Sequence, residues 1–279
     1  MRSLKKLSSL IIFLILFNAL PLVAEGAMTS MIVKPSIIRT ANELSVDYEI
    51  RNMNTDTASH LMVTTFLARS TNHSDVLGDV PRGESIHYNL ELNTADLLPG
   101  EYIMATRINF SGPDGKTHHA YHFSGITIKP ADIKKDTGPL SLLLKSPVLN
   151  PKSFWQPEGK FILTMENKLS QTVEPVVVFF LPDGFTVTEP ENVYTLVAHE
   201  KKSLKIPLSF ESNIDGANPY SVVIWYEADG RHYSQLINGT IRVEAAPIYF
   251  KIFLALSGFI ILALAVIYII RRRKRTAGN

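Results

Sequence analysis

Between residues 28 and 244, apolar side chains recur mostly at every second position, in short runs that Gly, Pro, Asn and Asp interrupt. Residues 44–51 are typical, because apolar and polar side chains alternate along the whole run. This alternation predicts a strand with one buried and one solvated face. No long stretch of the region has the 3.6-residue apolar period of a helix, so strands are predicted throughout it.

The strand pattern repeats at an offset of 115 residues. Phe110 aligns with Trp225 at this offset, and the Asp-Gly pairs at 114–115 and 229–230 coincide as hairpin turns. The other matched positions are Val46, Tyr48, Ile50 and Asn52 with Phe161, Leu163, Met165 and Asn167. The repeat predicts an all-β protein of tandem Ig-like or fibronectin-like β-sandwiches, at residues 28–129 and 140–244, joined by a polar linker at 130–139.

The two ends of the chain have the composition of membrane-targeting segments. Residues 1–26 have a basic start, a short apolar run and small residues at the end, as in a secretory signal peptide. Residues 252–270 form an unbroken apolar run of 19 residues, about 28 Å as a helix, which matches a bilayer core. We therefore predict a C-terminal transmembrane helix at 248–270, followed by a basic cytoplasmic tail at 271–279.

The charge distribution agrees with this division of the chain. All 26 acidic residues lie between Glu25 and Glu244, where only 19 of the 28 basic residues lie, so the body carries a net charge of −7. Because basic residues flank the apolar run on its C-terminal side, the tail is predicted to be cytoplasmic and the sandwiches extracytoplasmic or periplasmic. The acidic body argues against a nucleic-acid partner. The absence of cysteine favours a prokaryotic envelope protein.

The second unit resembles a known family at several segments. Asn167 in a turn, the run 176–185 that ends in Leu-Pro-Asp-Gly-Phe, and the strand-like run 204–210 are similar to bacterial and archaeal Ig-like envelope modules, such as the Ig-like domain associated with α-galactosidases. Leu-Pro-Asp-Gly is missing from the first unit, which has Leu-Pro-Gly-Glu-Tyr at 98–102. The resemblance implies an Ig-like fold and a noncatalytic accessory role.

Three histidines close together suggest a metal site. If residues 117–122 form a strand, His118 and His122 share a face but lie about 13 Å apart, since side chains repeat every ~6.6 Å on one face. One zinc ion needs its ligand atoms within about 2.1 Å. We therefore expect no metal and no cofactor, and interpret His118, His119 and His122 as solvated surface residues.

The two tryptophans have different expected roles. Trp225 alternates with Val223 and is expected in a core. Trp155 lies beside prolines and has no apolar partner in the repeat, so it is the candidate for contact with a binding partner. The long inter-strand stretches 68–84 and 182–202 are the other candidate contact loops.

The sequence contains none of the common catalytic motifs: no nucleophile elbow, no His-Glu-x-x-His and no phosphate loop. We therefore expect a protein that is not an enzyme, and no small-molecule ligand is expected. The preferred hypothesis is a membrane-anchored binding or assembly subunit that contacts an envelope or membrane protein. The alternatives are a surface protein with a C-terminal sorting tail, and an envelope hydrolase.

Overall fold

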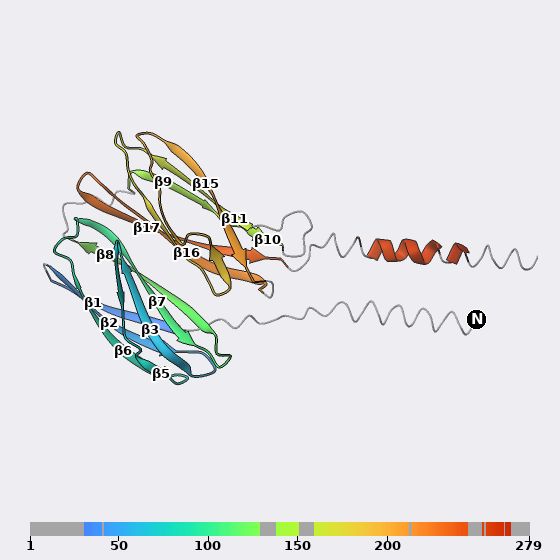
Figure 1. The fold of residues 1–279 in the computed structure, drawn as a ribbon, viewed down its shortest axis with the longest axis horizontal. Coiled ribbons are helices and arrows are strands. Elements are labelled where there is room, and N and C mark those ends of the chain that lie inside the picture. The colour runs from blue at the N-terminus through green and yellow to red at the C-terminus, as the bar shows by residue number, and fades with distance from the viewer. Residues whose placement is uncertain are drawn as a thin grey trace, which may run out of the picture.

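The computed structural model of the chain describes residues 31–40, 42–128, 138–150, 159–211, 214–244, 253, 255–264 and 266–268. These residues form two sandwiches of β-strands, and helix appears at 253–268 only (Figure 1). The all-β prediction is confirmed for the sandwiches. The signal peptide predicted at 1–26 and the tail predicted at 271–279 lie outside the described residues, as do residues 130–137 of the predicted linker.

The first sandwich packs a three-stranded sheet on a larger one. The small sheet has the order β1-β2-β6, with β1 Met31–Arg39, β2 Glu43–Asn52 and β6 Ser85–Asn93. The larger sheet contains β3 Ala58–Leu67, β4 Ser70–His73, β5 Gly78–Val80, β7 Gly100–Ser111 and β8 Thr117–Ile128. Apolar residues from alternate positions of both sheets form one buried core between them.

The second sandwich has the same plan. One sheet has the order β13-β15-β11-β9, with β9 Leu140–Lys145, β11 Gly159–Asn167, β13 Phe185–Val187 and β15 Lys201–Phe210. The other contains β10 Val148–Leu149, β12 Val176–Phe180, β14 Glu191–Val193, β16 Gly216–Ala228 and β17 Arg231–Val243. A second, separate core lies between these two sheets.

The two sandwiches share a buried asparagine with the same bonding pattern. Asn52 ends β2, its amide donates to the carbonyls of Asp56 and Val80, and its oxygen accepts the N–H of Asn54. Asn167 ends β11 in the same way, with donation to the carbonyls of Gln171, Leu196 and Val197 and acceptance from the N–H of Leu169. The structure therefore reproduces this part of the sequence repeat, and the Asn167 amide reaches one carbonyl more than the Asn52 amide.

The repeat departs from a constant offset at the Asp-Gly hairpins. Ala228 pairs directly with Arg231, so two residues form the second turn, whose Asp229 and Gly230 both have positive φ as a tight hairpin requires. In the first hairpin, Gly112 donates its N–H to the Lys116 carbonyl across a loop of three residues. The extra residue shifts β7 by one position against β16, and a shift of one position reverses the faces of a strand.

This shift changes the expected place of Trp225. Phe110, its partner in the sequence alignment, lies in the core of the first sandwich. Trp225 is buried, as predicted, but it lies on the opposite face of β16, in a third apolar cluster outside both sandwich cores. The sequence alignment is thus wrong by one residue along this strand.

The stretches 68–84 and 182–202 are not free loops, contrary to the expectation from sequence. The first contains β4 and β5, and the second contains β13 and β14. Ala68, Arg69 and Glu191 from the two stretches line one small cavity of about 40 Å³. Both stretches therefore take part in the contact between the sandwiches.

The described helical residues, at 253–268, are largely apolar and exposed. Within the described part of the chain, no helix is both long enough and apolar enough to cross a bilayer. The transmembrane helix predicted at 248–270 stays a prediction, and residues 248–252, 254, 265 and 269–270 of it lie outside the described residues.

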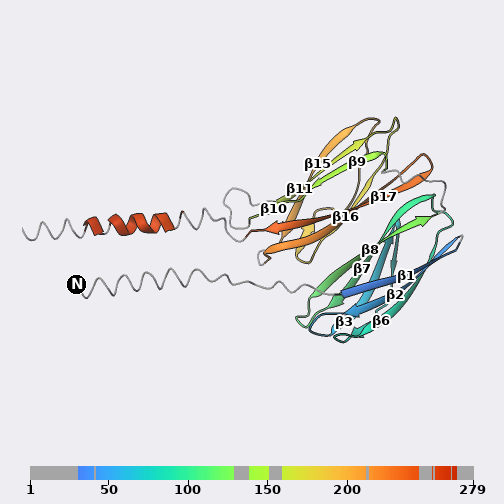
Figure 2. The ribbon, with the colours of Figure 1, turned by 180° about the vertical axis from the view of Figure 1, so that it is seen from behind.

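The two sandwiches lie side by side (Figures 1 and 2). The outer faces of their two larger sheets contact each other, and one parallel bridge, between Gly100 of β7 and His232 of β17, joins these sheets into a single ten-stranded sheet. This contact, here called the joint, positions the candidate functional site.

Candidate functional site

An aromatic cluster forms the apolar side of the joint. Phe180, at the end of β12, packs edge-on against Phe66, Tyr121 and Phe123 of the first sandwich, with ring centroids 5.7, 5.4 and 5.2 Å away. Edge-to-face pairs at these separations are favourable beyond the area that they bury. Phe180 therefore connects β3 and β8 of one sandwich to β12 of the other.

His232 fixes the end of the joint where the two sheets bridge. Its backbone N–H donates to the Pro99 carbonyl at 2.9 Å, and its ring stacks on Tyr102 with centroids 3.7 Å apart. A β-carbon on Gly100 would lie 2.0 Å from the His232 carbonyl oxygen, so only glycine permits this approach. Burial lowers the pKa of His232 to about 4, which keeps the imidazole neutral at pH 7.

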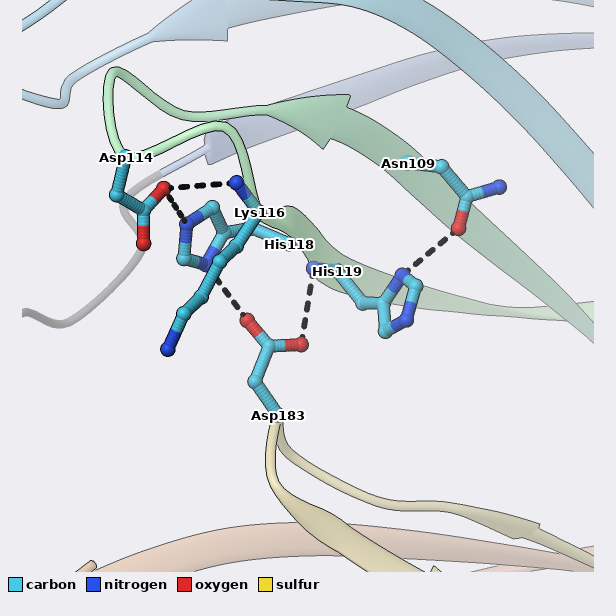
Figure 3. A network of polar contacts seen from close by, with 6 residues as sticks. All are labelled: Asn109, Asp114, Lys116, His118, His119 and Asp183. Carbon is cyan, nitrogen blue, oxygen red and sulfur yellow. Dashed lines mark hydrogen bonds and ion pairs between the residues drawn. The ribbon is translucent and has the colours of Figure 1, made fainter. Parts of the chain in front are cut away.

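A polar network forms the opposite side of the joint (Figure 3). Asp183, in the turn between β12 and β13, bonds with His118 through Oδ2 and Nδ1 at 2.9 Å, and accepts the backbone N–H of His119 through Oδ1 at 3.1 Å. His118 also contacts the Asp114 carboxylate at 3.3 Å, and the His119 ring contacts Asn109 at 2.8 Å. The Asp183 carboxylate of the second sandwich thereby binds the β7–β8 hairpin of the first sandwich.

The structure gives the three histidines a different setting from the one expected. They are partly buried and bonded: His118 contacts Asp183, the His119 ring contacts Asn109, and His122 bonds to Ser124 at 3.2 Å. Burial lowers the pKa of both His119 and His122. Across the described residues, no group of three or more His, Asp or Glu side chains has an arrangement that could hold a metal ion.

A groove of about 310 Å³ lies between the sandwiches beside this network. Arg107, His119 and Tyr121 line it from β7 and β8. Apolar side chains line it from the second sandwich, namely Phe179, Leu181, Pro182, Phe185, Val187 and Pro190. Grooves that combine an apolar wall with a few polar groups are typical of ligand sites.

The electrostatics of the groove depend on one cation and one anion. Burial raises the pKa of Tyr121 to about 12, so its hydroxyl stays protonated. Burial also keeps His119 neutral, and the positive charge of Arg107 acts in the same direction. Arg107 and Asp183 are therefore the charged groups that influence both side chains.

Arg107 was not a candidate from the sequence, and Asp183 was one only as part of the contact stretch 182–202. Asp183 belongs to the Leu-Pro-Asp-Gly-Phe segment that carried the family resemblance, but nothing in a local pattern pairs it with histidines 64 and 65 residues away. Trp155, the one predicted contact residue, lies outside the described residues. Trp225 lies on the apolar side of the joint, where the guanidinium carbon of Arg69 is 5.7 Å from its ring centroid.

No family model and no curated protein matches the chain. Among solved structures, a Salmonella alpha-2-macroglobulin is 12% identical with a TM-score of 0.32, and the match covers 80% of this chain but only 17% of that one. Red sea bream transglutaminase is 12% identical with a TM-score of 0.24, over 77% of this chain and 31% of that one.

A Porphyromonas gingivalis protein of unknown function matches over 99% of its own length and 77% of this chain, at 13% identity and a TM-score of 0.33. These similarities are too low to carry a function from any of the three proteins. The strand topology itself places both units in the Ig-like β-sandwich class.

Proposed function

We propose that this protein is a noncatalytic binding or assembly subunit of the cell envelope. Its two sandwiches, of the type that resembles the Ig-like modules associated with α-galactosidases, face the outside of the cytoplasmic membrane and contact a protein partner. A single C-terminal span holds them there, and the basic tail stays in the cytoplasm. The observation that carries the proposal is a strand with one edge unpaired among the described strands, on a body whose two halves are joined by a buried cluster.

The edge strand is β1. Of the described strands, it pairs only with β2, which leaves its other edge open to a further strand. Lys34 and Pro35 in its first half are residue types that oppose indiscriminate pairing. Its second half exposes Ile37 and Ile38, the latter 65% accessible. An extended segment of a partner that adds to such an edge gains backbone hydrogen bonds and apolar contacts.

The buried joint supports a role in assembly. Two sandwiches connected only by a linker move relative to each other by default. Here Phe180, Trp225 and the bridge at His232 fix one sheet against the other. A partner that contacts both sandwiches therefore meets a preformed surface, and pays less conformational entropy on binding.

The membrane anchor rests on the composition of the C-terminal segment. Residues 252–270 contain no charged side chain, and five basic residues follow directly at 271–275. The described apolar side chains of the helix, such as Phe259 and Ile261, are exposed and pack on neither sandwich core. A bilayer is the environment that removes such side chains from water.

The test is cross-linking of intact cells, extraction of the full-length chain in mild detergent, and mass spectrometry of the chain and its companions. We expect a stoichiometric envelope or membrane protein together with an untrimmed C-terminus. A partnerless chain without its last thirty or so residues would instead indicate a sorted surface protein.

A matched pair of variants tests the edge strand. Ile38→Lys places a charge on β1 and should reduce recovery of the partner several-fold. Leu143→Lys is the control, because Leu143 is similarly exposed on β9, the edge of another sheet. If the two variants recover equal amounts of partner, β1 is not the contact.

A further inference from the structure

The groove at the joint contains an arginine that has no anionic partner. Within the described part of the chain, no carboxylate lies within ion-pair distance of Arg107. Its Nε is buried and makes no hydrogen bond, while the guanidinium carbon lies 5.6 Å from the Phe66 ring centroid. The two terminal nitrogens of the guanidinium are not among the buried atoms, so they are the donors that an acceptor in the groove can reach.

The neighbouring carboxylate is already occupied. Asp183 uses one oxygen for the His118 ring and the other for the His119 backbone N–H. Those two bonds hold the Asp183 carboxylate at the wall of the groove. The carboxylate makes no ion pair with Arg107 there. The groove thus has one uncompensated positive group in a body whose net charge is −7.

The polar groups beside Arg107 are suited to a single carboxylate. Tyr121 lines the groove with a hydroxyl that makes no hydrogen bond within the described residues, and His119 lines it with a neutral imidazole. One arginine and one hydroxyl can satisfy the two oxygens of a carboxylate. A dianion such as phosphate would bring a second charge close to Asp183 with no second cation to balance it.

The opposite wall indicates what the carboxylate is attached to. Phe179, Leu181 and Phe185 belong to the second core and expose only 5–8% of their surface at the groove, and Pro182 and Pro190 extend this apolar wall. A volume of about 310 Å³ lies at the lower end of the range for small-ligand sites, roughly 300–1,000 Å³. The occupant is therefore small, with an apolar part that contacts this wall.

We propose that the groove binds a ligand with one carboxylate on a compact apolar body, in which Arg107 and Tyr121 hold the carboxylate and the wall around Phe185 holds the apolar part. A free aromatic or aliphatic acid and the C-terminal residue of a peptide share this chemistry. The site goes beyond the proposed assembly role, because it lies at the joint and not on β1.

The experiment measures binding of N-acetyl-phenylalanine to the full-length protein in mild detergent by calorimetry, with a detergent blank. We expect a dissociation constant near or below the millimolar range, as for other ligands of this size. N-acetyl-phenylalaninamide, which lacks the charge, should bind at least tenfold more weakly. Equal binding of acid and amide would overturn the proposal, and so would no binding of the acid at tenfold higher concentration.

Two arginine variants locate the site. Arg107→Gln should weaken binding of the acid by about tenfold to a hundredfold, since hydrogen bonds to a charged group are lost. Arg69→Gln is the matched control, because Arg69 also lies over an aromatic ring at the joint but outside the groove. Equal weakening by both variants would contradict the assignment, and thermal unfolding of each shows that it is folded.

A tetrapeptide that ends in phenylalanine distinguishes the two sources of carboxylate. If it binds at least as tightly as the acid, and Arg107→Gln abolishes this, the source is a chain terminus. If only the small acid binds, the source is a free acid. Both results support the groove, and neither depends on whether β1 binds a partner.

Discussion

The two sides of the joint hold the sandwiches together by different means. Around Phe180 and Trp225 the contact is aromatic, and the cavity beside it is only about 40 Å³. Around Asp183 the contact consists of a few hydrogen bonds beside a groove of about 310 Å³. Apolar packing contributes most of the stability of such a contact, whereas paired polar groups set its register. The stable side thus leaves the other side free to carry a ligand site.

The apolar side gives the largest expected effect. Phe180→Ala should lower the free energy of unfolding by about 3–5 kcal/mol, because it removes a buried ring and its three aromatic partners lose their contact. Urea unfolding of the full-length protein measures the change. Ile38→Ala is the control, and as an exposed substitution it should change stability by less than about 0.5 kcal/mol. If Phe180→Ala lowered the free energy of unfolding by less than about 1 kcal/mol, the aromatic cluster would not be the main source of stability at the joint.

The next effect is a dependence of stability on pH at His232. The pKa of this group is about 4 in the folded state, against an unperturbed value of about 6.5. Between these values the unfolded chain binds more protons, so stability is complete above pH 6.5 and falls as the pH drops toward 4. The shift corresponds to about 3 kcal/mol at 1.36 kcal/mol per unit.

His232→Phe separates this contribution from that of the other histidines. The variant keeps a ring to stack on Tyr102 but cannot be protonated. Its stability should therefore decline less between pH 6.5 and 4 than that of the natural protein. The pKa values of His119 and His122 are lowered too, so some decline should remain. If the stability of the variant and of the natural protein fell equally with pH, the imidazole of His232 would be solvated in the folded protein.

The polar side gives the smallest expected effect. Asp183→Asn keeps the shape of the side chain but removes its charge, so the bonds to His118 and His119 weaken by about 1 kcal/mol in this partly exposed place. Asp114→Asn is the control, because its carboxylate contacts the same His118 ring without linking the sandwiches. If Asp183→Asn proved as costly as Phe180→Ala, the polar network would be the main support of the joint.

Much of each sandwich follows from sequence, because its determinants are local. Alternation along 44–51 identifies β2, and Asn52 and Asn167 end equivalent strands as the repeat predicts. The joint does not follow, because it depends on which outer face of a sheet meets another. Asp183 reaches His118 across 65 residues, and no alternation of polar and apolar side chains encodes that contact.

The misplacement of Trp225 has a more specific cause. Matching the Asp-Gly pairs places it opposite Phe110, but the first turn has one residue more than the second. Side chains alternate between the two faces of a strand. A shift of one residue therefore moves a side chain from the face in the sandwich core to the face at the joint. An alignment scored by residue type does not detect this exchange, because both faces of β16 are apolar.

That extra residue also bears on how the chain avoids misassembly. Similar tandem units are prone to exchange strands while they fold. If β7 replaced β16 in the register that best matches the two sequences, Arg107 and Asn109 would take the positions of Val222 and Ile224, which are completely buried in the second core. A charged and an amide side chain without partners there would make the exchanged form unstable. The unequal hairpins thus favour pairing of each strand within its own sandwich over pairing with the strands of the other sandwich.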